Sequence, residues 1–310
     1  MRAVVTESYG AEPTMADVPM PGPGPGEVRV KVRSSSLNGF DFALARGYLK
    51  DLMEHRFPVV LGRDFAGTVD RVGEGVNELA PGAEVFGVVL TQPLNAGAFG
   101  EYLVVPEGHN IAPIPADVDH ATAGALGLAG AAAVGSLDAV SVQHGETVLV
   151  SGATGGVGAF VLQLARARGA TVIATAAPGA ETDHVRQFGA AHVVDRTQDL
   201  AAQVHQIAPD GLDAILHFAG DPFVLADLLV DGGRFASLLG VGPDQLADRA
   251  ITATAVYASP HRALLEHLAA EVAAGRLRIP VQRSYTLSQV PQAFVDFAAG
   301  TRGKLAVTVD

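Results

Sequence analysis

Apolar residues in the second half of the chain follow two alternating patterns. Short apolar runs are typical of buried strands, and the segments between them carry apolar residues at helical spacing. The predicted strands cover residues 147–150, 171–174, 193–194, 213–218, 232–239 and 252–257. The predicted helices cover residues 157–168, 183–188, 199–207, 222–229 and 260–274. This alternation predicts right-handed βαβ units and a parallel, doubly wound sheet, which the last helix closes.

The first third of the chain has a different pattern, in which glycine and proline set off short strands. Strands are predicted at residues 28–32, 64–72, 82–89 and 99–105, after a stiff loop at 19–27. A helical stretch at 120–141 leads into the second region. The last segment has a predicted helix at 290–299 and strand at 304–309. We expect this segment to return to the first domain, because a solitary strand needs a sheet to join. The expected fold class is therefore α/β, with a doubly wound domain and a β-rich domain.

Composition narrows the classes of function. The 310 residues are 48% hydrophobic and 17% charged, which is typical of a soluble globular protein long enough for two domains. The net charge of −12 argues against a nucleic-acid partner, because phosphate neutralisation needs clustered lysine and arginine. No apolar run of about 18 residues and no secretory leader is visible, so we expect no membrane span and a cytoplasmic location.

The chain contains no cysteine, which excludes disulfides, a four-cysteine structural zinc site and a catalytic thiolate. Its 10 histidines show no H-E-x-x-H spacing and no close pairing with carboxylates. The supply of metal ligands is therefore poor, and we expect no bound metal.

The most informative stretch is residues 151–158, which read SGATGGVG between a predicted strand and a predicted helix. This arrangement places a pyrophosphate at the helix N-terminus, where free N–H groups and the positive end of the helix dipole meet the anion. Gly155 and Gly156 let the backbone approach the phosphates, and Gly158 allows close contact between helix and strand. Ala153 stands in place of the first glycine of the G-x-G-x-x-G pattern. The stretch predicts a dinucleotide cofactor.

The end of the second strand bears on which dinucleotide is bound. Chains that bind NAD usually place an acidic residue about twenty positions after the glycine turn, where it accepts a hydrogen bond from the ribose 2′-hydroxyl. Residues 174–178 read ATAAP, without a carboxylate to repel a 2′-phosphate, which favours NADP(H). His184, Arg186 and Arg196 follow as candidate phosphate ligands, and solvated helix charges are the alternative interpretation.

Six segments in one order carry a family resemblance. They are GEVRVKVRSSSLNGFD at 26–41, FPVVLGRDFAGTV at 57–69, PGAEVFGVV at 81–89, AGAFGEYLVVPEGHNIAPIP at 96–115, ETVLVSGATGGVGAFVLQLAR at 146–166 and RGKLAVTV at 302–309. The chain resembles zinc-independent medium-chain dehydrogenases/reductases of the NADPH:quinone oxidoreductase (zeta-crystallin-like) type. The resemblance implies a GroES-like catalytic domain at 1–115 with a C-terminal return at 278–310. It also implies a Rossmann NADP(H)-binding domain at 116–277.

The resemblance implies a reaction that proceeds without a metal. Zinc-dependent relatives carry Cys-x-x-Asp where this chain has NGFD at 38–41, and Gly-His-Glu where it has GRD at 62–64. We interpret Asp41, Arg63 and Asp64 as an ion-pair cluster in the empty metal region, where a guanidinium would repel Zn²⁺. Without a Lewis acid to polarise an alcohol, a quinone or enone that delocalises the incoming charge is the expected hydride acceptor.

The resemblance also suggests which residues act. The catalytic candidates are Asn38, expected near the nicotinamide as an uncharged donor, Tyr48, expected in the cleft-lining segment, and Arg63. The structural alternatives are a turn-forming asparagine and a packed loop aromatic. The cofactor-binding candidates are Ala153, Thr154, Gly155, Gly156, Val157, Thr175, Arg196, Phe218, Ala219, Gly220, Leu239 and Val256. His217 stands where relatives often have an aspartate. It is a candidate titrating group near the cofactor, and a satisfied core histidine is the favoured interpretation.

Two other functions remain open. One is reduction of an enoyl thioester or alkenal by the same fold, which would call for a basic entrance that the acidic chain hardly offers. The other is a non-catalytic NADPH-binding structural or sensor protein, since AAAV at 131–134 replaces the Leu-Thr-Ala-Trp of relatives and its hydroxyl. We also expect a homodimer, because residues 252–258 are small, uncharged and β-prone, as an edge meant for pairing should be.

Overall fold

The computed structural model describes residues 1–309 and contains two compact units. One unit is formed by Met1–Leu128 together with the chain from Pro260 onward, and the other by Ala129–Ser259. Both boundaries differ from the expected ones at 115 and 277. Helix α8 (Arg262–Ala273) packs against β8 (Ile111–Pro113) of the first unit, so the expectation that it closes the nucleotide-binding sheet is wrong. Its apolar face is satisfied by the β-rich unit, which periodicity alone does not reveal.

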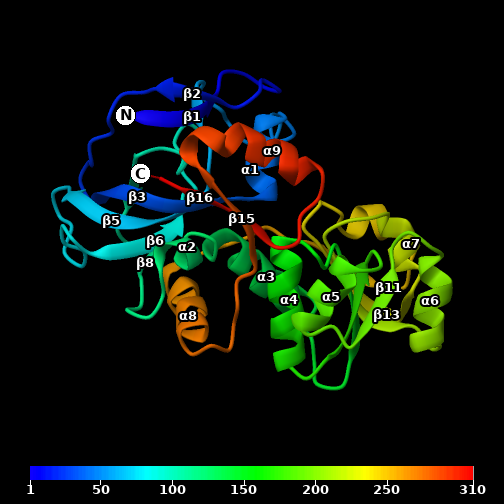
Figure 1. The fold of residues 1–310 in the computed structure, drawn as a ribbon. Helices are drawn as coiled ribbons and strands as arrows, with labels where there is room; N and C mark the ends of the chain where they lie inside the picture. The colour runs from blue at the N-terminus through cyan, green and yellow to red at the C-terminus, as the bar shows by residue number, and fades with distance from the viewer. Residues whose placement is uncertain (310) are drawn as a thin grey trace. The chain divides into compact units, whose positions relative to one another are not determined.

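The second unit is built on a six-stranded parallel sheet, as the alternation of strands and helices predicts (Figure 1). In spatial order its strands are β11 (His192–Asp195), β10 (Thr171–Ala176), β9 (Thr147–Ser151), β12 (Leu212–His217), β13 (Leu229–Ser237) and β14 (Thr252–Ala255). Four helices connect them, namely α4 (Gly156–Ala167), α5 (Ala180–Gln187), α6 (Leu200–Ile207) and α7 (Pro222–Ala226). A 3₁₀ turn at Pro243–Leu246 precedes β14. The doubly wound fold class is confirmed.

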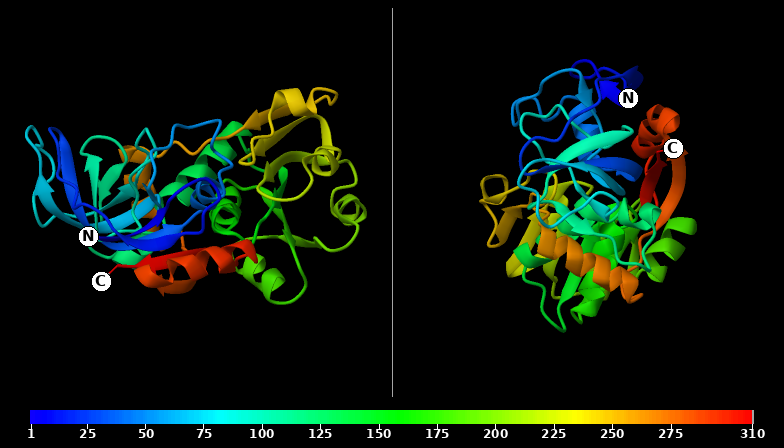
Figure 2. Two further views of the ribbon diagram at one scale, coloured as in Figure 1. Left: turned by 90° about the horizontal axis from the view of Figure 1, so that it is seen from above. Right: turned by 90° about the vertical axis from the view of Figure 1, so that its left-hand side faces the viewer.

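The first unit is organised around the long strand β3 (Glu27–Leu37). It pairs antiparallel with β5 (Asp64–Val72), β7 (Tyr102–Pro106) and β16 (Lys304–Thr308). The sheet continues through β6 (Glu84–Val88), β8 and β15 (Val281–Thr286), and a second sheet contains β1 (Arg2–Thr6), β2 (Thr14–Asp17) and β4 (Val59–Val60). Beside β15 and β16 lies α9 (Val290–Ala298), preceded by a 3₁₀ turn at Leu287–Gln289 (Figure 2). The last strand thus reaches a sheet in the first unit, where it was expected to return.

The helical stretch predicted at 120–141 is interrupted in the structure. It forms α2 (His120–Ala123) and α3 (Gly127–Ala139), with Gly124 as the C-cap of the first. A Cβ at Gly124 would lie 2.9 Å from the Ser34 hydroxyl oxygen, so the chain passes close to β3 at this point. The interruption starts a new helix at Gly127, and the N–H of Leu128 in its first turn is free to donate to a side chain. Among residues 1–309, no helix is long and apolar enough to cross a membrane.

Candidate functional site

The glycine turn after β9 has the geometry that a bound pyrophosphate requires. Gly152 adopts φ +74°, and a Cβ there would lie 3.1 Å from the main-chain carbon of Phe218. A Cβ at Gly158 would lie 2.5 Å from the carbonyl oxygen of Ala153, so only glycine lets α4 start this close to the strand. Gly155 is the N-cap of α4, and a Cβ there would meet only a carbonyl oxygen at 3.7 Å. The turn is therefore tight where helix meets strand and open at the helix N-terminus.

The first residues of α4 point unused donors at this opening. The N–H groups of Gly156 and Val157 lie in the first turn, where a helix offers no internal acceptor. Ala153 is buried beneath the turn and Thr154 is partly exposed. An open helix N-terminus of this kind fits the diphosphate of a dinucleotide.

Hydrogen bonds join the carboxyl ends of neighbouring strands in the same unit. The N–H of Phe218 donates to the Ser151 carbonyl (3.1 Å), and the Ser151 hydroxyl donates to the Ala219 carbonyl. The N–H of Gly152 donates to the Thr175 hydroxyl (3.1 Å) at the end of β10. The structure thus places three predicted cofactor residues, Thr175, Phe218 and Ala219, against the start of the glycine turn. In parallel sheets this edge is where ligands bind.

The ends of β12, β13 and β14 are joined in the same way. His217 is buried at the end of β12, with Nε2 3.1 Å from the Gly220 carbonyl and Nδ1 2.9 Å from the Ser237 hydroxyl. The Ser237 hydroxyl also accepts the N–H of Leu239 (3.0 Å), and the Ser237 carbonyl accepts the N–H of Val256 (2.8 Å). Burial lowers the pKa of His217 from its ordinary value of 6.5. A satisfied histidine therefore connects three predicted cofactor residues.

The end of β10 requires a correction. A carboxylate does lie there, because Glu181 in the first turn of α5 accepts the N–H of Ala177 (2.7 Å). Arg196 binds the same carboxylate through Nε (3.1 Å) and Nη2 (2.9 Å). The sequence argument considered only the strand end itself, whereas the acid reaches it from the following helix. The expectation that this position has no carboxylate is wrong.

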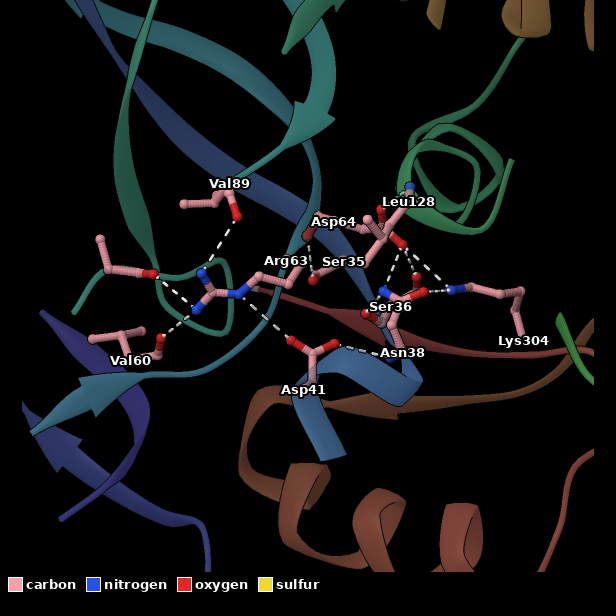
Figure 3. A network of polar contacts seen from close by, with 11 residues as sticks. Ser35, Ser36, Asn38, Asp41, Val60, Arg63, Asp64, Val89, Leu128 and Lys304 are labelled. Atoms are coloured by element: carbon pink, nitrogen blue, oxygen red, sulfur yellow. Dashed lines mark hydrogen bonds and ion pairs between the residues drawn. The ribbon is translucent and has the colours of Figure 1, made fainter. Parts of the chain in front are cut away.

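A second polar cluster lies buried in the first unit around Asp64 (Figure 3). One carboxylate oxygen, Oδ1, accepts the N–H of Leu128 (2.7 Å). The other, Oδ2, accepts the Ser36 hydroxyl (2.6 Å) and the Asn38 amide (2.9 Å) and lies 3.3 Å from the Lys304 ammonium. Lys304 was not among the predicted site residues, although it lies within the quoted RGKLAVTV segment. Lys304 is 240 residues from Asp64 in the sequence, and the two come together only because β16 pairs with β3.

Of the predicted ion-pair cluster of Asp41, Arg63 and Asp64, only the pair of Arg63 with Asp41 is formed, at 3.7 Å between Nε and Oδ1 with both side chains fully buried. Asp64 instead pairs with Lys304. The guanidinium also donates to the carbonyls of Val60 (3.3 Å), Val89 (3.3 Å) and Ala96 (3.0 Å). Burial lowers the pKa of Arg63, and burial raises the pKa of Asp41 to about 6 despite the neighbouring guanidinium. Arg63 therefore joins the end of β4 to the segments at Val89 and Ala96.

The other two catalytic candidates occupy contrasting environments. Asn38 is the N-cap of α1 (Gly39–Ala45), and its amide donates to Asp64 and to the Ser36 carbonyl (3.2 Å). Its Oδ1 accepts from the Lys304 ammonium (2.5 Å), so both N–H donors of the amide are already used within the chain. Tyr48, by contrast, is 70% exposed in the turn after α1. Donation by Asn38 to a cofactor would require breaking one of these bonds.

The residues at the family's metal positions do not fit a zinc ion. An ammonium bridges Asn38 and Asp64, and a guanidinium stands at position 63, so cations already fill the region. Within residues 1–309, no group of three or more histidine, cysteine, aspartate or glutamate residues could hold a metal.

Two family models match the chain. An alcohol dehydrogenase GroES-like domain matches residues 24–116, and a zinc-binding dehydrogenase model matches residues 188–307. The first match lies within the β-rich unit. The second covers the later strands of the parallel sheet and continues through β15 and β16 of the β-rich unit.

Individual proteins are also similar. The chain is 30% identical over 287 residues to the mitochondrial NAD(P)H oxidoreductase RTN4IP1 of Mus musculus, covering 82% of this chain and 71% of that protein. A solved quinone oxidoreductase from Coxiella burnetii superposes with a TM-score of 0.87 at 25% identity, covering 100% of this chain and 99% of that one. The polyketide synthase system protein NorB of Streptomyces orinoci is 35% identical over 298 residues, and these cover 89% of this chain. The chain spans only 13% of that protein's length.

Proposed function

Because this chain belongs to the medium-chain dehydrogenase/reductase superfamily, in its quinone oxidoreductase type, we propose that it transfers hydride from NADPH to a quinone or similar enone without zinc. The observation that carries the zinc-free part of the proposal is the Lys304 ammonium between Asn38 and Asp64. A site that holds its own cation cannot supply a Lewis acid for alcohol oxidation. A conjugated acceptor needs none, since its own oxygen takes the developing charge.

The second unit supplies the cofactor contacts. NADPH brings the hydride and its reactive carbon when bound. The open first turn of α4 would hold the diphosphate through the N–H groups of Gly156 and Val157, beside Thr154. The strand-end residues Phe218, Ala219, Gly220, Leu239 and Val256 would line the nicotinamide end with backbone and apolar groups, as expected at this edge of the sheet.

The Glu181–Arg196 pair supports NADPH over NADH. The Arg196 guanidinium donates to both carboxylate oxygens of Glu181, and the Ala177 N–H donates to one of them. These bonds compete with any bond from a ribose hydroxyl to this carboxylate. A main-chain N–H and a guanidinium are also the donors that a 2′-phosphate prefers. When NADPH binds, the phosphate would take these two donors and Glu181 would turn away.

Oxidation of NADPH by the purified chain tests the proposal. The cofactor absorbance is followed with a panel of quinones, enones and simple ketones, and NADH is run in parallel. We expect turnover with quinones or enones, little with ketones, and a preference for NADPH. Absence of NADPH oxidation with every acceptor would refute the reaction. Tight NADPH binding without any turnover would instead favour a non-catalytic sensor.

Adding alkenals and enoyl thioesters to the panel separates quinone reduction from the alternative reduction of those substrates. Assembly is tested separately. Strand β14 lies at the edge of its sheet, with Thr252–Ala255 small and uncharged, and we propose that two copies pair along it. Light scattering should give twice the mass of 31.8 kDa, and a monomer would contradict the pairing.

A further inference from the structure

His217 makes two hydrogen bonds whose direction can be assigned. The Gly220 carbonyl can only accept, so the proton of the ring must be on Nε2 (3.1 Å). In the neutral ring Nδ1 is then an acceptor, and the Ser237 hydroxyl donates to it (2.9 Å). The remaining capacity of that hydroxyl oxygen accepts the N–H of Leu239 (3.0 Å). The three bonds form a series in which the imidazole and the Ser237 hydroxyl each donate one hydrogen bond and accept one.

These bonds connect the loops that follow β12 and β13, in addition to the main-chain bond from the Leu238 N–H to the His217 carbonyl (3.2 Å). Residues 218–220 follow β12, and residues 238–240 follow β13. Gly220 and Gly240 both have positive φ, +91° and +77°, so each loop turns sharply after its strand. The His217 ring is 1% exposed and packs 5.3 Å from the Phe235 ring, which fixes its place between them.

We propose that His217 is a positioning residue whose neutral ring holds the loops 218–220 and 238–240 together at the nicotinamide end of the cofactor site. This inference rests on the proposed function for the identity of the ligand. Protonation would place a hydrogen on Nδ1, facing the Ser237 oxygen, which already accepts the Leu239 N–H. The Ser237 oxygen has two lone pairs and can accept both hydrogens, but its own hydrogen would lose its acceptor in a fully buried position, beside a buried charge. Protonation therefore destabilises the joined arrangement of the two loops. Acid should therefore loosen the loops and weaken cofactor binding.

The surroundings of the ring favour its neutral form. Asp221, the N-cap of α7, attracts the protonated ring, but its carboxylate is engaged by the Phe223 N–H (2.8 Å). The neighbours from β13 are Ser237 and Phe235, which are uncharged. Burial outweighs Asp221 and lowers the pKa of His217, so the connection persists at neutral pH.

Two substitutions separate positioning from packing. His217→Gln keeps a donor for the Gly220 carbonyl, His217→Asn keeps a partner for the Ser237 hydroxyl, and neither side chain titrates. The control is His205→Gln on α6, an exposed histidine of the same unit. NADPH dissociation constants are measured by cofactor fluorescence from about pH 7.5 down to 5, in parallel with 2′,5′-ADP, which lacks the nicotinamide.

We expect the wild-type chain and H205Q to lose about tenfold in NADPH affinity per unit of pH once the ring is mostly protonated, with little change for 2′,5′-ADP. H217Q and H217N should bind NADPH with a flat profile. An equal acid loss in H217Q and wild type, or none in wild type, would overturn the inference. Failure to bind NADPH at any pH would refute the proposed function instead. The ¹⁵N shifts of the ring then still decide, because a neutral Nδ1–H tautomer overturns the positioning role.

Discussion

Replacing Lys304 by methionine tests whether the buried cluster around Asp64 is held by charge. The ammonium is 3% exposed and contacts the Leu37 carbonyl (3.4 Å), Asn38 Oδ1 (2.5 Å) and Asp64 Oδ2 (3.3 Å). Methionine retains most of the aliphatic stem, so the change removes the charge and its hydrogen bonds with little loss of packing.

The size of the effect follows from what Asp64 retains. Removing one partner of a buried ion pair typically costs about 3–5 kcal/mol, because a charge stays buried without compensation. Asp64 would keep three donors, from Ser36, Asn38 and the Leu128 N–H, which continue to solvate its charge. We therefore expect the lower end, a loss of about 3 kcal/mol in the free energy of unfolding of the first unit. In K304M/D64N the loss should shrink to about 1 kcal/mol, since no charge remains unpaired.

Urea unfolding at pH 7.5 measures the free energy of unfolding of K304M, D64N and K304M/D64N. It is followed by far-UV circular dichroism, because the chain has no tryptophan. Lys50→Met, in an exposed turn of the same unit, is the matched control and should change stability by less than about 0.5 kcal/mol. The reasoning fails if K304M is as stable as K50M. It also fails if the effects of K304M and D64N simply add, because an ion pair must couple its partners.

Three further predictions concern other parts of the molecule. Glu181→Gln should raise the preference for NADPH over NADH about fivefold, while Asp183→Asn on the same helix should leave the ratio of dissociation constants unchanged. Gly158→Ala should destabilise the second unit by about 1–3 kcal/mol in urea. Gly155→Ala should change stability little, because its Cβ would meet only the Gly152 carbonyl oxygen at 3.7 Å, but it should weaken NADPH binding about tenfold, because that Cβ stands at the opening where the diphosphate would bind. Asp41→Asn should flatten the pH dependence of stability. The fold raises the pKa of this carboxyl from 3.8 to about 6, so the unfolded chain releases the proton at a lower pH than the folded chain does. The free energy of unfolding therefore falls by about 3 kcal/mol as the pH rises from 4 through 6. Equal slopes of melting temperature against pH in D41N and wild type would contradict this.

The local pattern of apolar residues predicted the elements of the parallel sheet, because the periodicity of each strand or helix is contained within about ten residues. The glycine turn was readable for the same reason, since its geometry depends on adjacent residues. Lys304 was missed because its role arises from the pairing of distant segments, β16 with β3. Glu181 was missed for a local reason: it lies only four residues after Ala177, but the sequence argument considered the strand end and not the first turn of the helix that follows. The placement of α8 was wrong because its apolar face does not specify which sheet covers it.

The pairing of β16 with β3 has a consequence for how the chain acquires its structure during synthesis. The second unit is contiguous in sequence, so its strands can pair as soon as Ser259 has left the ribosome. The first unit cannot finish then, because the Lys304 ammonium must reach the Leu37 carbonyl 267 positions earlier. Until that happens β3 presents an unpaired strand edge, which is open to association with other chains. Translation of residues 260–304 is thus an interval in which this strand edge is exposed to misassembly.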